Sequence, residues 1–117
     1  MIRILLLFIH ILQEPATSDQ ITEMLQANRF YIKTVVDIRQ RILAGGGEMH
    51  SDCEDTLLNN GSQQTDVWGT SWNPLSQEIF YESMVNLRPR QNRSMEILDP
   101  LIREQVKQII YRLLGGL

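Results

Sequence analysis

The densest group of side chains that could do chemistry follows three consecutive glycines. Residues 48–55 read EMHSDCED and contain one histidine and four carboxylates. In a strand, His50, Asp52 and Glu54 would point to the same side, because side chains alternate along a strand. In a helix, His50 and Glu54 would be neighbours one turn apart. We therefore expect His50 and Glu54 to lie close together in either conformation.

Such a cluster could serve acid–base chemistry or bind a divalent metal ion. A neutral imidazole beside carboxylates can act as a base that its acidic neighbour orients, or it can ligate a metal. The candidate catalytic residues are His50, Asp52 and Glu54, and the same three residues are the candidate metal ligands. The competing interpretation is a solvated acidic segment with one histidine, since no second histidine lies nearby in the sequence.

A second polar group is cationic. Residues 83–95 include three arginines and no acidic residue. Guanidinium groups hold carboxylates or phosphates through paired hydrogen bonds, and amide side chains supply further ones. The candidate ligand-binding residues are Arg88, Arg90, Asn92 and Arg93, with Trp68 as an aromatic wall. The group predicts an anion site, or else a structural partner of the acidic cluster, and Trp68 could equally belong to the buried core.

Composition limits the classes of partner. The chain has 117 residues, 43% of them hydrophobic, which suits one folded domain spanning 1–117. Its net charge of -3 lacks the basic excess that drives binding to nucleic acids. Cys53 is the only cysteine, which excludes an internal disulfide, and its acidic neighbours disfavour a reactive thiolate. We expect a small anionic ligand or a protein as the partner, and no nucleic acid.

The N-terminal stretch Ile2–Leu12 is almost continuously apolar. It is about half as long as the ~20 residues that span a membrane. Ala16, where a signal peptide could be cleaved, has Glu14 two positions earlier, which does not suit cleavage. We predict a strand buried on both faces that Pro15 ends, and residues 1–10 are either its extension or a non-native start. We therefore expect a cytoplasmic protein that does not contact a membrane. The alternative is that this stretch is a targeting segment.

A helix and a strand are expected next. Thr17 and Gln20 have the spacing of a capping box, which predicts a short helix as far as Asn28. Apolar and polar residues alternate over 31–39, which is typical of a half-buried strand. A helix over Thr34–Leu43 is the alternative, and the three consecutive glycines end either element.

Turn signals divide the rest of the chain. Asn60-Gly61 predicts a hairpin between strands at 56–58 and 67–69, and the apolar stretch Ile79–Leu87 predicts a central strand. Asp99-Pro100 predicts the start of a long helix, whose apolar residues recur at helical spacing. The expected fold class is α+β: a largely antiparallel sheet of about four to five strands, with a short N-terminal helix and a longer C-terminal helix packed on one face.

Several motifs in a fixed order give the chain a resemblance to a known family. They are VVDI at 35–38, LAGGGEMHSD at 43–52, GS at 61–62, VWG at 67–69, NLRP at 86–89 and NRS at 92–94. From about Ile11 onward the chain resembles the DUF5674 family, small bacterial proteins that share a domain of unknown function. The resemblance implies a single small domain, and it implies no activity, cofactor or catalytic residue.

Three functions are compatible with these observations. The first is a non-catalytic module that binds a ligand or a protein, with the acidic and histidine segment facing the arginine segment. The second is a small metal-assisted or acid–base enzyme that acts on an anionic substrate. Its residues would be His50, Glu54, Arg88 and Arg90. The third is a homo-oligomer in which the N-terminal strand pairs with another copy across a sheet edge.

Overall fold

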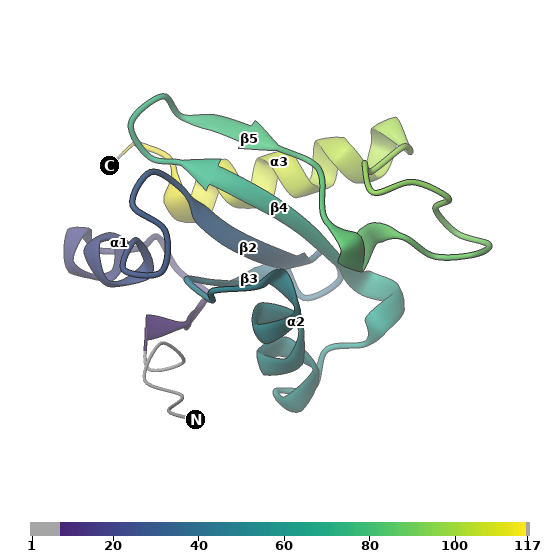
Figure 1. Cartoon of the computed structure of the whole chain (residues 1–117), viewed down its shortest axis with the longest axis horizontal. Helices are drawn as coiled ribbons and strands as arrows, with labels where there is room; N and C mark the ends of the chain where they lie inside the picture. Colours follow the sequence, from purple (N-terminus) through teal and green to yellow (C-terminus); the bar gives the residue numbers. More distant parts are fainter. Residues whose placement is uncertain (1–7, 117) are drawn as a thin grey trace.

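Five antiparallel strands form one sheet in the order β1-β3-β2-β4-β5 (Figure 1), so β2 is central and β1 and β5 are the edges. The computed structural model describes residues 8–116. The strands are β1 (His10–Leu12), β2 (Ile32–Asp37), β3 (Ile42–Gly45), β4 (Val67–Asn73) and β5 (Glu78–Phe80). The helices are α1 (Ser18–Met24), α2 (His50–Asn59) and α3 (Pro100–Leu114), with short 3-10 turns η2 (Gln64–Asp66) and η3 (Met84–Asn86). The predicted α+β class and antiparallel sheet are confirmed.

The two faces of the sheet bury different sets of side chains. On one face, Ile32 of β2 packs in a cluster with Trp68 and Trp72 of β4. Helices α1 and α3 contribute buried residues to the same cluster, and α3 runs behind the sheet in Figure 1. On the other face, Val35 packs in a second cluster that includes Leu57 of α2. Because strand side chains alternate, neighbouring residues of β2 supply both clusters.

The prediction that the helices pack on one face is therefore not confirmed, because α2 covers the opposite face. The hairpin expected around Asn60-Gly61 is wrong, since residues 56–58 form the last turns of α2. Gly61 has a φ of 102° and follows the end of this helix, where the amide of Ser62 donates to Leu57 O at 3.0 Å. A helix C-terminus and a hairpin turn both use a residue with positive φ, so the same dipeptide can serve either.

The central strand expected at Ile79–Leu87 is also wrong. Strand β5 covers only Glu78–Phe80 and forms an edge of the sheet, paired with β4. The chain then turns into η3, where Ser83 Oγ accepts a hydrogen bond from the Val85 amide at 3.2 Å. An apolar stretch therefore did not identify a central strand here, because part of its apolar surface is exposed: Phe80 is 50% and Met84 is 72% exposed.

The short helix and the strand expected next are confirmed as α1 and β2, but β2 is buried on both faces rather than half-buried, because α2 covers its second face. Thr17 and Gln20 form the capping box, with hydrogen bonds of 3.1 and 2.9 Å between side chain and backbone. The segment 34–43 is shared between β2 and β3, so the alternative helix is wrong. The predicted N-terminal strand is only partly confirmed, because β1 covers just His10–Leu12 at an edge of the sheet and its first two residues are half-buried rather than buried. Residues 8 and 9 precede the strand, and residues 1–7 lie outside the described residues.

Gly69 allows η3 to approach β4 closely. Asn86 Oδ1 accepts a hydrogen bond from the Gly69 amide at 2.7 Å, and Asn86 Nδ2 donates to Gly69 O at 2.9 Å. A Cβ atom at position 69 would lie 2.6 Å from the side chains of Ser83 and Val85. Such a contact is shorter than van der Waals distance, so the crossing requires glycine at this position.

We expect Gly69→Ala to lower the free energy of unfolding by about 1–3 kcal/mol, because the added methyl group overpacks the crossing. Urea unfolding followed by tryptophan fluorescence measures the change. Gln105→Ala, on the exposed side of α3, is a control that should stay within about 0.5 kcal/mol of the wild type. A Gly69→Ala protein as stable as the control would contradict the close approach.

Candidate functional site

His50 is the first residue of α2 and is fixed against β4. Its Nε2 lies 2.6 Å from Thr70 O, and a carbonyl oxygen can only accept, so Nε2 carries a proton. Burial lowers the pKa of His50 from its ordinary value of 6.5; the hydrogen bond with Thr70 opposes this shift and the charge of Lys33 adds to it. The imidazole is therefore neutral at pH 7 and donates its Nε2–H to the backbone.

A hollow of about 310 Å³ opens beside this histidine. Its lining consists of Lys33, Met49, His50, Ser51, Ser83, Met84 and Val85. Lys33 Nζ donates to Glu48 O at 3.0 Å, which holds the ammonium group near the start of α2. Among the residues that the structure describes, no carboxylate lines this hollow. Its one permanent charge is therefore positive.

A second hollow of about 450 Å³ adjoins the first at Lys33. Its lining consists of Tyr31, Lys33, Ser71, Asn73, Phe80 and Glu82. Lys33, Ser71 and Phe80 are opposite one another across β2, β4 and β5, so they form one row on this face of the sheet. We call the two hollows together the His50 groove. The groove occupies the part of the sheet face beside α2.

Exposed apolar side chains border the groove. Met49 is 57% exposed, Met84 is 72% exposed and Phe80 is 50% exposed. Methionine adapts its shape to an apolar partner because its unbranched chain has several rotatable bonds. The groove thus combines a half-buried lysine with an adaptable apolar border, and Glu82 is the one carboxylate in its described lining.

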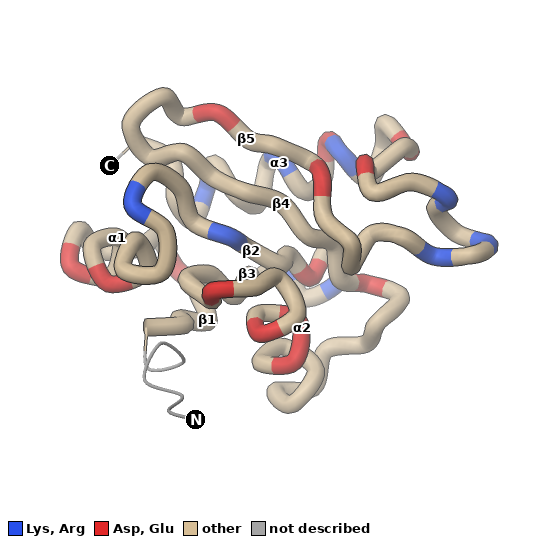
Figure 2. Tube along the Cα trace, in the orientation of Figure 1, with Lys and Arg blue, Asp and Glu red and all other residues tan. Residues whose placement is uncertain are grey.

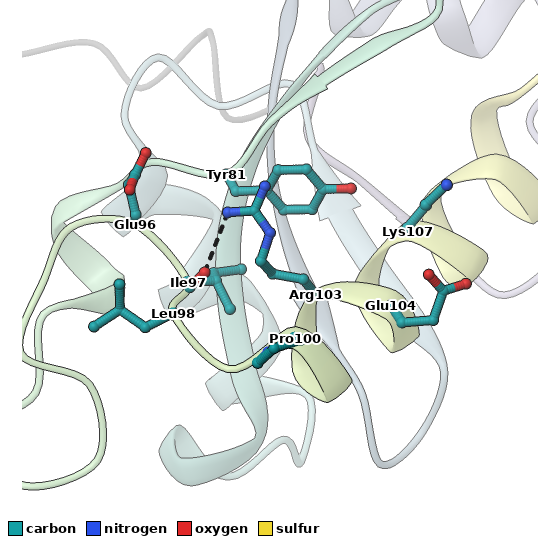
Figure 3. A pocket seen from close by; sticks show the side chains of 8 residues that line it. All are labelled: Tyr81, Glu96, Ile97, Leu98, Pro100, Arg103, Glu104 and Lys107. Atoms are coloured by element: carbon teal, nitrogen blue, oxygen red, sulfur yellow. Dashed lines mark hydrogen bonds between the residues drawn. The ribbon is translucent and has the colours of Figure 1, made fainter.

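Another hollow, of about 490 Å³, lies elsewhere, at the start of α3. Figure 3 shows the guanidinium group of Arg103 across the ring of Tyr81. The guanidinium carbon lies 4.1 Å from the centre of this ring, and Nη1 of Arg103 donates to Ile97 O at 3.2 Å. Glu96 and Glu104 line this hollow together with Arg103 and Lys107. These charges balance, so the hollow favours neither an anion nor a cation.

The predicted metal ligands do not come together. Asp52 lies two residues after His50 in α2 and therefore about 200° around the helix axis from it, whereas Glu54 is one turn away on the same side. Within residues 8–116, no three His, Cys, Asp or Glu side chains are close enough to hold a metal ion. The helix keeps the expected proximity of His50 and Glu54 and separates Asp52 from them.

Glu54 and Arg88 attract each other across the contact between α2 and the segment after η3. Burial raises the pKa of Glu54, and the positive charge of Arg88 opposes this shift. Arg88 donates hydrogen bonds to Val67 O and to Thr65 O, and its guanidinium carbon lies 4.1 Å from the ring centre of Trp68. The acidic and arginine segments thus meet through this pair, and Trp68 is buried beneath Arg88 in the core.

The other arginine-segment candidates have different surroundings. Asn92 is buried and uses its amide group for four hydrogen bonds with the backbone. Arg90 and Arg93 are exposed on the loop that extends furthest from the sheet in Figure 2. The structure therefore does not bring Arg90 or Arg93 into the His50 groove, whose lining contains neither.

Comparison with known proteins identifies a family. The model of the family described as "Protein of unknown function (DUF5674)" matches residues 10–113. The chain belongs to this family. No curated protein and no solved structure matches it. The resemblance that the ordered motifs carry is confirmed. The His50 groove and the loop that contains Arg90 and Arg93 both lie within the part of the chain that matches DUF5674.

Sequence reasoning missed most of the groove of this DUF5674 protein. Lys33 belongs to the strand expected at 31–39, where alternation places it on the polar side, and this was the available signal. The sequence predicts Ser83 and Met84 within a central strand, and this prediction does not place them at the border of a hollow. None of the described helices has the length and hydropathy needed to cross a membrane.

We expect the stability of the protein to fall as the pH drops below 6.5, with part of this loss due to His50. Because burial lowers the pKa of His50 in the folded state, the unfolded chain binds the proton more readily. The contribution of the neutral imidazole is therefore complete above the unfolded pKa and is lost as the pH falls through and below it.

His50→Gln tests this contribution, since glutamine can still donate to Thr70 O and does not titrate. Urea unfolding of both proteins at intervals from pH 8 to pH 5 gives the difference in their free energies of unfolding. The difference should shift in favour of the variant as the pH falls. A difference that stays constant over this interval would show that His50 is not buried in its neutral form.

Proposed function

We propose that this protein is a non-catalytic binding module whose ligand places an anionic group beside Lys33 and an apolar group along the border of the His50 groove. The observation that carries the proposal is the position of Lys33. It lines both hollows, and the described lining of the hollow that it shares with His50 has no carboxylate to neutralise it. Glu82 lines only the adjoining hollow, so an anionic ligand beside His50 would supply the negative charge that this hollow lacks.

The donors around Lys33 suit a carboxylate or a phosphate. An ammonium group has three N–H donors, and the hydrogen bond with Glu48 O uses one of them. Ser51 and Ser83 also line this hollow and carry hydroxyl groups that can donate to an anion. Hydrogen bonds between a charged donor and a charged acceptor are stronger than neutral ones, particularly where protein excludes water.

His50 supports this site through the backbone. Its Nε2–H donates to Thr70 O, and this bond connects the first residue of α2 to the interior strand β4. The neutral imidazole adds no charge of its own at pH 7. We infer that His50 fixes the helix start beside Lys33, while Lys33 provides the attraction for the ligand.

The apolar border favours a ligand that is more than an inorganic ion. Met49 and Met84 line the same hollow as Lys33, and Phe80 lies in the adjoining one. A small molecule with a carboxylate and a short hydrocarbon chain would contact both kinds of surface at once. Burying the hydrocarbon contributes roughly 25 cal/mol per Å².

Hexanoate and hexanol are suitable probes, since they share the hydrocarbon chain and differ in charge. We expect hexanoate, added to 15N-labelled protein, to shift the amide signals of Lys33, Ser71 and Ser83 more than hexanol does. Lys33→Met should weaken hexanoate binding about tenfold to a hundredfold, because a hydrogen bond to a charged group contributes about 1.5–3 kcal/mol.

The matched control is Lys107→Met, which removes the same charge from the hollow at α3. It should leave the hexanoate titration unchanged. The proposal is wrong if hexanoate and hexanol shift the same signals equally, or if Lys33→Met binds hexanoate as well as the wild type does.

A further inference from the structure

We propose that the arginine hairpin, which comprises residues 86–98, is an interaction surface for an acidic segment of another protein. It is separate from the His50 groove and does not depend on the function proposed for that groove. The hairpin extends away from the sheet, and Figure 2 shows its basic residues gathered toward the tip. Its one acidic residue is Glu96, in the arm that leads back to α3. Four observations support the proposal: a fixed backbone, unpaired guanidinium groups, exposed apolar neighbours and the distribution of charge over the chain.

Two buried asparagines fix the backbone of the hairpin. Asn92 Nδ2 donates to Asn86 O, Ser94 O and Glu96 O at 3.0, 2.8 and 2.7 Å, and its Oδ1 accepts from the Leu98 amide at 3.0 Å. Asn86 in turn connects the hairpin to β4 through its pair of hydrogen bonds with Gly69. A surface that is already ordered loses less conformational entropy on binding.

The backbone also pairs within the hairpin. The amide of Arg88 donates to Asn92 O at 2.7 Å, and the amide of Asn92 donates to Arg88 O at 3.2 Å. Pro89, Arg90 and Gln91 therefore form a closed tip between two paired residues. This geometry fixes the distance between the chain positions of Arg90 and Arg93.

The guanidinium groups of Arg90 and Arg93 have no carboxylate partner. Arg93 Nε donates to Pro89 O at 2.8 Å, which holds this side chain across the base of the tip. Neither arginine forms an ion pair with Asp or Glu anywhere in residues 8–116. Arg88 differs, since it is half-buried, stacks on Trp68 and is attracted by Glu54. Arg90 and Arg93 are thus the two cations that the hairpin presents to a partner.

Apolar side chains lie next to these cations. Leu87 is 52% exposed, Met95 is 45% exposed and Leu98 is 55% exposed. All three belong to the arms of the hairpin that flank the arginine tip. Exposed apolar side chains beside a charged centre are typical of surfaces that bind proteins.

The charge of the whole chain favours an acidic protein segment over nucleic acid or a lipid surface. The chain has a net charge of -3, and Figure 2 shows acidic residues along α1 and α2. An extended polyanion would meet these carboxylates, whereas a short acidic segment can contact the hairpin alone. The hairpin sequence also has no aromatic residue on which a base could stack.

Carboxylates of Asp or Glu can pair with each guanidinium fork through two parallel hydrogen bonds. Intervening apolar residues of the same segment would contact Leu87 and Met95. The expected partner is therefore a protein segment in which acidic and apolar residues alternate. Lysine cannot replace arginine in such an arrangement, because an ammonium group lacks the planar fork.

The probe is a fluorescently labelled, acetylated peptide of alternating Glu and Leu, titrated with the full chain and followed by anisotropy. We expect measurable binding that weakens as salt is raised, and no binding of the corresponding Lys and Leu peptide. Arg90→Glu should weaken binding by about tenfold or more. Arg29→Glu makes the same charge change at an exposed arginine after α1 and should weaken it by less than about threefold.

A double variant, Arg90→Lys with Arg93→Lys, separates geometry from charge. It retains both positive charges and should bind the acidic peptide about fivefold more weakly than the wild type. Thermal unfolding of each variant checks that the fold is intact. Lys33→Met should leave peptide binding unchanged, so failure at this surface is distinguishable from failure at the groove.

Several results would overturn the proposal. One is equal binding by the double lysine variant and the wild type, since that would show that positive charge alone, without the guanidinium geometry, accounts for the binding. Another is equal weakening by Arg29→Glu and Arg90→Glu. Tighter binding to a DNA oligonucleotide or to vesicles containing phosphatidylserine than to the peptide would assign the hairpin to a different class of partner. Absence of peptide binding at low salt would also refute it.

Discussion

The pairing of β2 with β4 governs the rest of the structure. These two strands are adjacent along their whole length, from Ile32 opposite Trp72 to Asp37 opposite Val67, and almost all of their side chains are buried. Strands buried on both faces need a cover on both faces, because an uncovered apolar face would be exposed to water. The need for α2 therefore follows from this pairing, although the sequence of α2 itself gives little sign of a helix.

The hydrogen bonds of β4 with its neighbours then place both proposed surfaces. Thr70 O holds His50 at the start of α2, while Gly69 holds Asn86 at the base of the arginine hairpin. These are consecutive residues of one strand. A change in the twist or register of β4 would therefore move the groove and the hairpin together, because a strand transmits displacement along its backbone to every partner that it anchors.

Local signals predicted the elements that depend on local chemistry. The capping box at Thr17 and the Asp99-Pro100 helix start are each encoded within a few residues, and the residues of β2 favour a strand although its burial does not alternate. No comparable local signal predicts α2, since only Cys53 and Leu57 are buried in it and Met49 offers no side-chain cap. The groove could not be predicted for a related reason. Lys33 and Ser83 are far apart in the sequence, and only the order of the strands makes them neighbours.

Arg88, Arg90 and Arg93 belong to one short segment, yet their surroundings in the fold differ. Residue type alone therefore does not show which of them is held inside the structure and which is exposed. Arg88 is half-buried, because its guanidinium group stacks on the ring of Trp68 and donates hydrogen bonds to the carbonyl oxygens of Thr65 and Val67. Arg90 has none of these neighbours and stays exposed at the tip. Burial of a guanidinium group is tolerated where ring faces and acceptors compensate for lost water. The difference between the half-buried Arg88 and the exposed Arg90 thus arises from η2 and the start of β4, which supply the acceptors and the ring face beside Arg88.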